Sequence, residues 1–155
     1  MTDEIEIVHA LPGHTNEVAP LFDAYRCWYG RKSDPAGARS FIRKRLTSNE
    51  SEMFFARRSG RAVAFAQLYP VFSSVSMGRV WGLNDLYVTE PVRHEGVGTI
   101  LLETAAEFAR ALGAVRIQLK TKHDNTVAQA ACEALGWKQD SKFRHYSLNV
   151  SEYDG

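Results

Sequence analysis

The order of apolar and polar residues predicts alternating strands and helices along this chain of 155 residues. Residues 4–9 alternate between polar and apolar side chains, which is typical of a strand with one buried face. Residues 16–29 repeat apolar positions at helical spacing and are followed by a glycine, a common helix end. A proline behind Ser33 or Asp34 predicts a second helix over residues 35–46.

The middle of the chain predicts two strands, a serine-rich connection and a third strand. Residues 53–58 and 62–69 flank Ser59-Gly60, a dipeptide typical of a hairpin turn. The serine-rich residues 71–78 predict either a loop or a weakly defined strand edge. Bulky residues favour a long central strand over residues 79–88, and a following proline ends it because proline has no N–H for a sheet ladder.

The rest of the chain predicts a helix, a strand, a second helix and two closing strands. Helical spacing begins at Val97, and a strand is expected over residues 114–121. Asn125 opens the next helix, which a glycine ends, and residues 137–140 and 143–150 are the closing strands. The element order predicts an α+β fold with a mixed sheet. Because there is no repeat or linker, we expect a single domain over residues 1–155.

Composition is that of an ordinary soluble globular protein, with 45% hydrophobic and 24% charged residues. The net charge of +1 favours neither nucleic acid nor an anionic membrane as a partner. No apolar run approaches the ~20 residues that span a bilayer, and the first residues are acidic where a signal peptide is basic. Cys27 and Cys132 form no metal-ligand or disulfide pattern. We expect a cytoplasmic protein without a metal.

The strongest chemical signal is the turn between the central strand and the following helix. Gly96 and Gly98 have no Cβ, so a ligand can approach the backbone, and the first N–H groups of a helix lack internal acceptors. Such a turn attracts phosphate through these N–H groups and the helix dipole. Arg93 adds a cation. The loop lacks the lysine of a Walker A motif and the third glycine of a dinucleotide fingerprint.

The pattern Arg93-x-x-Gly96-Val97-Gly98 resembles the acetyl-CoA pyrophosphate loop of the GNAT N-acetyltransferase superfamily. A second stretch, Asn125 to Trp137, resembles the family's other cofactor element, in which an Asn opens a helix, an Ala follows three residues later and Leu-Gly-aromatic closes it. The resemblance covers roughly residues 53–148. It implies that acetyl-CoA binds to Leu86, Tyr87, Val88, Arg93, His94, Glu95, Gly96, Val97, Gly98, Thr99, Asn125 and Ala128.

The same resemblance implies the GNAT fold. In that fold a central mixed, mostly antiparallel sheet of about seven strands is flanked by four helices. The central strand and the next one splay apart in the middle of the sheet, and the pantetheine arm lies in the gap. A backbone N–H near Val88 would then hydrogen-bond the thioester carbonyl.

Acetyl transfer to an amine needs a base, because a primary ammonium has a pKa near ~10. Around residues 83–88 the chain resembles polyamine acetyltransferases, which often carry Glu-Asp where this chain has Asn84-Asp85. Asp85 is therefore the candidate to act through water or to hold the ammonium, with Asn84 orienting a water. The alternative for Asp85 is a structural carboxylate, hydrogen-bonded to local backbone.

The departing thiolate needs a proton, and many family members donate it from a Tyr at the position that Cys132 fills here. A thiol, with a pKa near ~8.5, could replace that Tyr as the acid. The alternative is that Cys132 is a small apolar residue on a helix face and that Tyr87, Tyr146 or water supplies the proton.

Aromatic residues could wall the acceptor site. Tyr25, Trp28, Tyr29 and Tyr69 offer cation–π contacts to an alkyl-ammonium chain, although core packing also accounts for Tyr25 and Trp28. The second predicted helix is basic. If it borders the acceptor mouth, it favours an acceptor that carries a carboxylate, such as a lysine analogue.

Together these residues predict an N-acetyltransferase that moves the acetyl group of acetyl-CoA to a primary amine by direct attack in a ternary complex. The chain most resembles bacterial acetyltransferases of the polyamine, lysine-analogue and histone type, so the expected acceptor is a polyamine or a lysine-like small molecule. Two alternatives stay open: a protein or peptide lysine acetyltransferase, and a non-catalytic acyl-CoA-binding sensor. The family also admits a homodimer.

Overall fold

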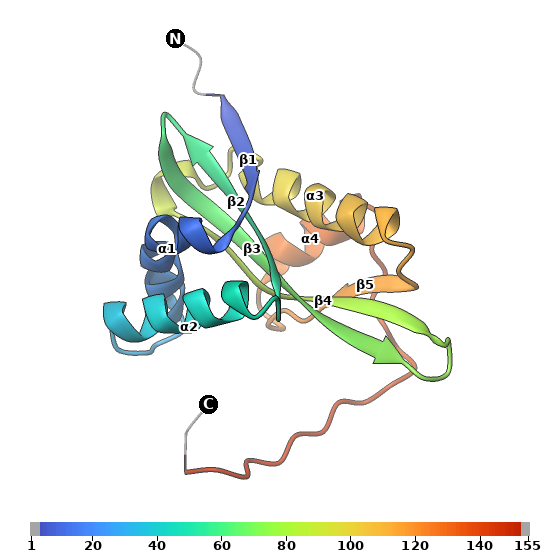
Figure 1. The fold of residues 1–155 in the computed structure, drawn as a ribbon. Coiled ribbons are helices and arrows are strands. Elements are labelled where there is room, and N and C mark those ends of the chain that lie inside the picture. Colours follow the sequence, from blue (N-terminus) through green and yellow to red (C-terminus); the bar gives the residue numbers. More distant parts are fainter. Residues whose placement is uncertain (1–3, 153–155) are drawn as a thin grey trace. The chain divides into compact units, whose positions relative to one another are not determined.

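The computed structural model describes residues 4–152. The chain divides into two compact units, unit 1 up to Lys122 and unit 2 from His123 onward. Unit 1 holds all the strands and three of the helices, and unit 2 holds one helix and the C-terminal segment (Figure 1).

Unit 1 is built on one mixed sheet with the strand order β1-β2-β3-β4-β5. The first four strands pair antiparallel, and β5 joins β4 in parallel. The mixed, mostly antiparallel sheet is as predicted, and β3 takes in part of the serine-rich segment. The strands are β1 (Ile5–His9), β2 (Glu52–Arg58), β3 (Arg61–Ser73), β4 (Gly78–Val88) and β5 (Arg116–Leu119).

Helices cover both faces of this sheet (Figure 1). They are α1 (Thr15–Trp28), α2 (Pro35–Thr47) and α3 (Val97–Ala111), with short 3₁₀ turns η1 (Pro12–His14) and η2 (Glu90–Val92). Successive strand residues point to opposite faces. Phe54 of β2 therefore meets Phe108 of α3, whereas its neighbour Phe55 joins the core beneath α1 and α2.

The central strand contains a bulge at the point where the sheet opens. Gln67 of β3 pairs with Asp85, but Leu68 pairs with Leu83, so Asn84 is the extra residue of β4. The β4–β5 pairing also ends at Leu83. Beyond it, within the part of the chain that the structure describes, residues 84–88 pair with β3 alone. The ladder therefore stops on that side of β4, and the gap for the pantetheine arm stays a prediction.

Helix ends follow the sequence signals closely. Asp34 caps α2 by accepting a hydrogen bond from the Gly37 N–H (3.0 Å). Gly30 ends α1 at a φ of +88°, with the Arg31 N–H bonded to the Arg26 carbonyl (3.0 Å). This is a Schellman motif, which uses the left-handed conformation that glycine adopts without a steric penalty.

Unit 2 begins with α4 (Thr126–Ala134), which Asn125 caps and Gly136 ends at a φ of +92°. The two closing strands predicted over residues 137–140 and 143–150 are wrong, since no residue described in those segments is paired in a sheet. The sheet therefore has five strands, and the predicted count of about seven is wrong. In the second of these segments Tyr146, Leu148 and Val150 are exposed. A segment forms a strand only where a neighbouring edge supplies ladder hydrogen bonds.

No helix among residues 4–152 is both long and apolar enough to cross a membrane. The homodimer and the cytoplasmic location stay predictions.

Candidate active site

Asp85 lies in the middle of the sheet and keeps only 6% of its surface exposed. The Gln67 side chain donates to Asp85 Oδ2 (2.9 Å), and the Asn84 side chain donates to Oδ1 (3.2 Å). These partners are side-chain amides, whereas the structural alternative predicted bonds to the local backbone. Because Asn84 is the bulged residue of β4, its side chain can donate to the carboxylate of the next residue, Asp85.

Burial is the largest influence on the Asp85 carboxyl group and raises its pKa above the usual range, because the charged form loses hydration. The hydrogen bonds from Gln67, Tyr25 and Asn84 act in the opposite direction. Burial and the negative charge of Asp85 also raise the pKa of the Tyr25 phenol, and they raise that of Tyr69 to about 12. Both phenols therefore stay protonated at neutral pH.

Two site residues were missed by sequence reasoning. Gln67 is fully buried and Ser51 keeps 4% of its surface exposed. The Ser51 hydroxyl donates to Gln67 Oε1 (2.8 Å), so the two side chains continue the hydrogen bonds of Asp85 across the sheet. A lone amide within the apolar run of β3 is the signal that could have identified Gln67, since a buried polar side chain needs a partner.

Three of the four predicted wall residues meet in one aromatic cluster. The ring of Tyr29 lies 5.1 Å from those of Tyr25 and Trp28, and Tyr87 of β4 lies 6.0 Å from Tyr25. Tyr25 also packs against the buried core, as its alternative predicted, and its role in an acceptor wall stays a prediction. Tyr69 approaches from β3 instead. The charge of Asp85 contributes to the raised pKa of the Tyr69 phenol, but the Tyr69 ring makes no contact with the other rings among the described residues.

Two cations lie on this cluster. The Arg93 guanidinium carbon is 5.6 Å from the centre of the Tyr87 ring and 5.9 Å from that of Trp28, and its Nε donates to the Val88 carbonyl (2.8 Å). The Lys122 ammonium is 5.0 Å from the centre of the Tyr29 ring. Arg93, predicted as a cofactor contact, thus links the start of the phosphate loop to α1.

The predicted phosphate loop turns through two left-handed residues, His94 (φ +67°) and Gly96 (φ +84°). Gly96 is the N-cap of α3, and no side chain from the described part of the chain caps this helix end. A Cβ placed on Gly96 would meet nothing within 4 Å, and one on Gly98 would meet only Val88 Cγ2 at 3.7 Å. The loop is therefore open beside both glycines, which fits a phosphate that binds helical N–H groups.

Glu95 places a negative charge in this loop, which would oppose a phosphate. Arg58 of β2 donates to its carboxylate (3.0 Å), so the charge is paired within unit 1. The Arg58 Nε is buried and has no hydrogen-bond partner among residues 4–152.

The remaining predicted site residues lie in unit 2. Asn125 accepts a hydrogen bond from the Ala128 N–H (3.2 Å), as a helix cap does. Cys132 is buried, and burial, with a smaller contribution from Glu133, raises the pKa of its thiol. Their roles at the cofactor and as an acid stay predictions.

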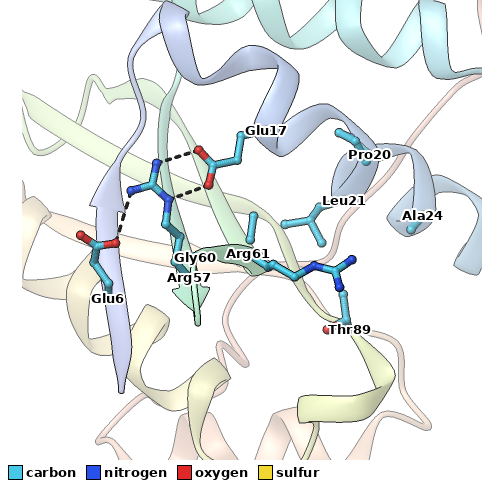
Figure 2. Close-up of a pocket in the computed structure, with 10 residues that line it drawn as sticks. Glu6, Glu17, Pro20, Leu21, Ala24, Arg57, Gly60, Arg61 and Thr89 are labelled. Atoms are coloured by element: carbon cyan, nitrogen blue, oxygen red, sulfur yellow. Dashed lines mark hydrogen bonds and ion pairs between the residues drawn. The ribbon is translucent and has the colours of Figure 1, made fainter. Parts of the chain in front are cut away.

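A cavity of about 750 Å³ opens beside α1 and the β2–β3 turn (Figure 2). Arg57 binds Glu17 there through two hydrogen bonds (2.6 and 2.7 Å) and Glu6 through a third (3.3 Å). The bond from Arg57 lowers the pKa of Glu17, which makes this carboxylate a weak base. Since no predicted site residue lines the cavity, we do not place the reaction in it. Its lining residues are Glu6, Glu17, Pro20, Leu21, Ala24, Arg57, Gly60, Arg61, Ala62 and Thr89.

Comparison with known proteins decides the family. The model of the acetyltransferase (GNAT) family matches residues 18–137. The chain belongs to the GNAT acetyltransferase family. It is 44% identical to an uncharacterized N-acetyltransferase, YhfO, from Bacillus subtilis (strain 168), over 86% of this chain and 89% of the relative. A crystal structure of a probable acetyltransferase superposes with a TM-score of 0.90 at 43% identity, over 96% of this chain and 99% of that one.

A more distant relative is a D-amino-acid N-acetyltransferase, HPA3, from Saccharomyces cerevisiae (strain ATCC 204508 / S288c), 35% identical over 56% of this chain and 53% of the relative. The family and the named homologues identify this GNAT protein as an acetyl-CoA-dependent N-acetyltransferase, as the sequence predicted. No three potential ligand side chains gather into a metal site in residues 4–152.

Proposed function

We propose that this enzyme acetylates a small primary amine, a polyamine or a lysine-like molecule, by direct attack in a ternary complex, with Asp85 as the base. The observation that carries the proposal is the buried carboxylate beside the open part of β4. Asp85 is the residue at which the β4 bulge, the aromatic cluster and the end of the β4–β5 ladder converge.

The chain's own residues would prepare the amine. An ammonium cannot attack, so Asp85 would hold it and take its proton, directly or through a water that Asn84 orients. Burial suits Asp85 to this task because a raised pKa brings a carboxylate closer to neutral pH, where a base is most effective. Tyr25 and Tyr69, kept protonated, would donate hydrogen bonds beside it.

Within unit 1, the cofactor side rests on the β4–α3 loop. Acetyl-CoA supplies an acetyl group that its thioester activates for attack by an amine. The N-terminal N–H groups of α3, with Gly96 and Gly98, would hold its phosphates, and the gap-facing backbone near Val88 would orient the thioester carbonyl. Cys132 of unit 2 is the acid that the family resemblance implies for the departing thiolate, and its raised pKa makes the thiol a weaker proton donor.

Within this proposal the lysine-like acceptor is favoured over the polyamine. Arg93 and Lys122 already place positive charge on the aromatic cluster, so a polycation would be repelled and an acceptor with a carboxylate would be attracted. A relative named for D-amino acids acts on acceptors of this kind, which carry an amine and a carboxylate. The alternatives remain a protein lysine acceptor and, against the names of the homologues, an acyl-CoA sensor.

The test is thiol release from acetyl-CoA by the purified protein with spermidine, putrescine, lysine, S-aminoethylcysteine and a basic peptide. Turnover with lysine or S-aminoethylcysteine above that with the two polyamines supports the proposal in its favoured form. Turnover with the peptide alone would replace it with a protein acetyltransferase. Tight acetyl-CoA binding without any turnover would favour an acceptor outside this panel or the sensor.

A further inference from the structure

Three buried polar side chains, one just before β2, one in β3 and one in β4, form a line of hydrogen bonds that ends at Asp85. Ser51 precedes β2, Gln67 lies in β3 and Asp85 lies in β4, and the register places Gln67 directly opposite Asp85. Each of the three side chains keeps at most 6% of its surface exposed. Buried polar side chains in a sheet core are costly unless their hydrogen bonds are made, so these contacts constrain one another.

The direction of these hydrogen bonds is fixed by chemistry. Ionised Asp85 can only accept, so Gln67 must turn its NH₂ toward Oδ2 and its Oε1 away. Oε1 then needs a donor, and the Ser51 hydroxyl supplies it at 2.8 Å. Without that hydroxyl, Oε1 would be buried without its donor, and this cost would weaken the preference for the present orientation of the amide over the flipped one. The flipped amide would set an oxygen against the carboxylate.

We propose that Gln67 and Ser51 are positioning residues: Gln67 holds the ionised Asp85 carboxylate through Oδ2 and leaves Oδ1 for Asn84 and the acceptor, and Ser51 acts only by fixing the orientation of the Gln67 amide. The inference rests on the proposed role of Asp85 as base. Neither residue lies among the predicted catalytic or cofactor contacts, and both are too deep in the core to meet an acceptor directly.

Other groups also face Asp85 and set the background for a titration. Tyr25 approaches from α1, Tyr69 from β3 and Asn84 from β4. Arg45 of α2 and Glu50 act on Tyr69 and are paired with each other (3.1 Å). These groups are unchanged in the variants below, so they cancel in the comparison.

The experiment measures the pKa of Asp85 in the intact protein by ¹³C NMR of its carboxyl group, which does not depend on turnover. In Gln67→Met, a length-matched apolar substitution, we expect that pKa to rise by about one pH unit, because the carboxylate loses a donor. The acid limb of the kcat/KM profile should move upward by the same amount, while KM for acetyl-CoA stays unchanged.

Ser51→Ala gives the decisive comparison. It should raise the Asp85 pKa in the wild-type background, and it should have no further effect in the Gln67→Met background, because Ser51 acts through Gln67. Additive shifts in the double variant would overturn the relay, as would an unmoved carboxyl resonance in a folded Gln67→Met. If Gln67→Met does not fold, the Ser51→Ala shift alone decides, and a pKa equal to that of the wild type rejects the proposal.

This readout separates the inference from the proposed function. If the carboxyl pKa moves as expected but no amine is acetylated, the relay stands and the assignment of Asp85 as base fails. If turnover is normal and the pKa does not move, the base stands and the relay fails.

Discussion

The Asp85 site and the β4–α3 loop serve the two partners of the proposed reaction, and they are built in opposite ways. The loop offers backbone N–H groups at an exposed glycine turn, all from neighbouring residues. The Asp85 site is buried and assembled from side chains of separate elements. A site made of backbone groups is therefore determined by a few neighbouring residues, whereas a site made of side chains from several strands depends on sheet register.

The sharpest way to break the comparison is to remove the charge of Asp85 and keep its shape. In Asp85→Asn we expect kcat to fall about 10²- to 10⁴-fold, the usual contribution of a positioned base, with unchanged acetyl-CoA affinity. Thiol release under saturating acetyl-CoA measures the rate, and calorimetry measures the affinity.

Glu103→Gln is the matched control, since it removes an exposed carboxylate on α3. Its rate should equal that of the wild type. A wild-type rate in a folded Asp85→Asn would remove this carboxylate from the reaction and restore its structural alternative.

The loop is tested by filling the space above its backbone. Gly98→Trp should weaken acetyl-CoA binding at least ~10²-fold, because an indole covers the N–H groups that a phosphate needs. Gly98→Ala should fold normally, since its Cβ meets Val88 Cγ2 at an ordinary 3.7 Å. Gly13→Trp, at an open position in η1, controls for a large exposed side chain. Unchanged affinity in Gly98→Trp would refute the phosphate site.

Local features of the fold were predicted well from the sequence. The turn at Ser59-Gly60, the cap at Asp34 and the glycine ends at Gly30 and Gly136 all depend on a few adjacent residues. Their chemistry is fixed by backbone conformation and short-range hydrogen bonds, which neighbouring residue types determine. The fold class followed from the order of these elements and from the family resemblance.

Features that depend on register were not predictable. Gln67 reaches Asp85 because the β3–β4 register places the two residues opposite each other, next to a bulge that no residue pattern predicts. The pairing of Glu95 with Arg58 joins a loop to a distant strand. The C-terminal segment shows the opposite error. There a local pattern predicted two strands, but a strand also needs a neighbour, and local pattern carries no information about that.

A smaller effect is expected from the Arg58–Glu95 pair, in which a side chain of β2 neutralises a charge in the β4–α3 loop. In Arg58→Gln, Glu95 loses its partner and leaves a negative charge in the phosphate loop, so acetyl-CoA affinity should fall about 3- to 10-fold. Calorimetry should show a full recovery in the double variant with Glu95→Gln. If the double variant binds as weakly as Arg58→Gln, Arg58 contacts the cofactor itself.

The smallest expected effect is on the free energy of unfolding, which the buried charge of Asp85 lowers at neutral pH. A raised pKa means that folded Asp85 binds its proton more tightly than unfolded Asp85. The stability that this tighter proton binding gives the fold is therefore fully present below the pKa of Asp85 in the unfolded chain. It is lost as the pH rises through the pKa of Asp85 in the folded protein. Asn keeps an acceptor for Gln67 and has no charge to desolvate. Asp85→Asn should thus be more stable than the wild type at neutral pH, by about 0.5–2 kcal/mol, and this advantage should vanish in acid. Urea unfolding at the two pH values measures it, and a variant that is less stable at neutral pH would show that the hydrogen bonds of Asp85, and not its burial, dominate its energetics.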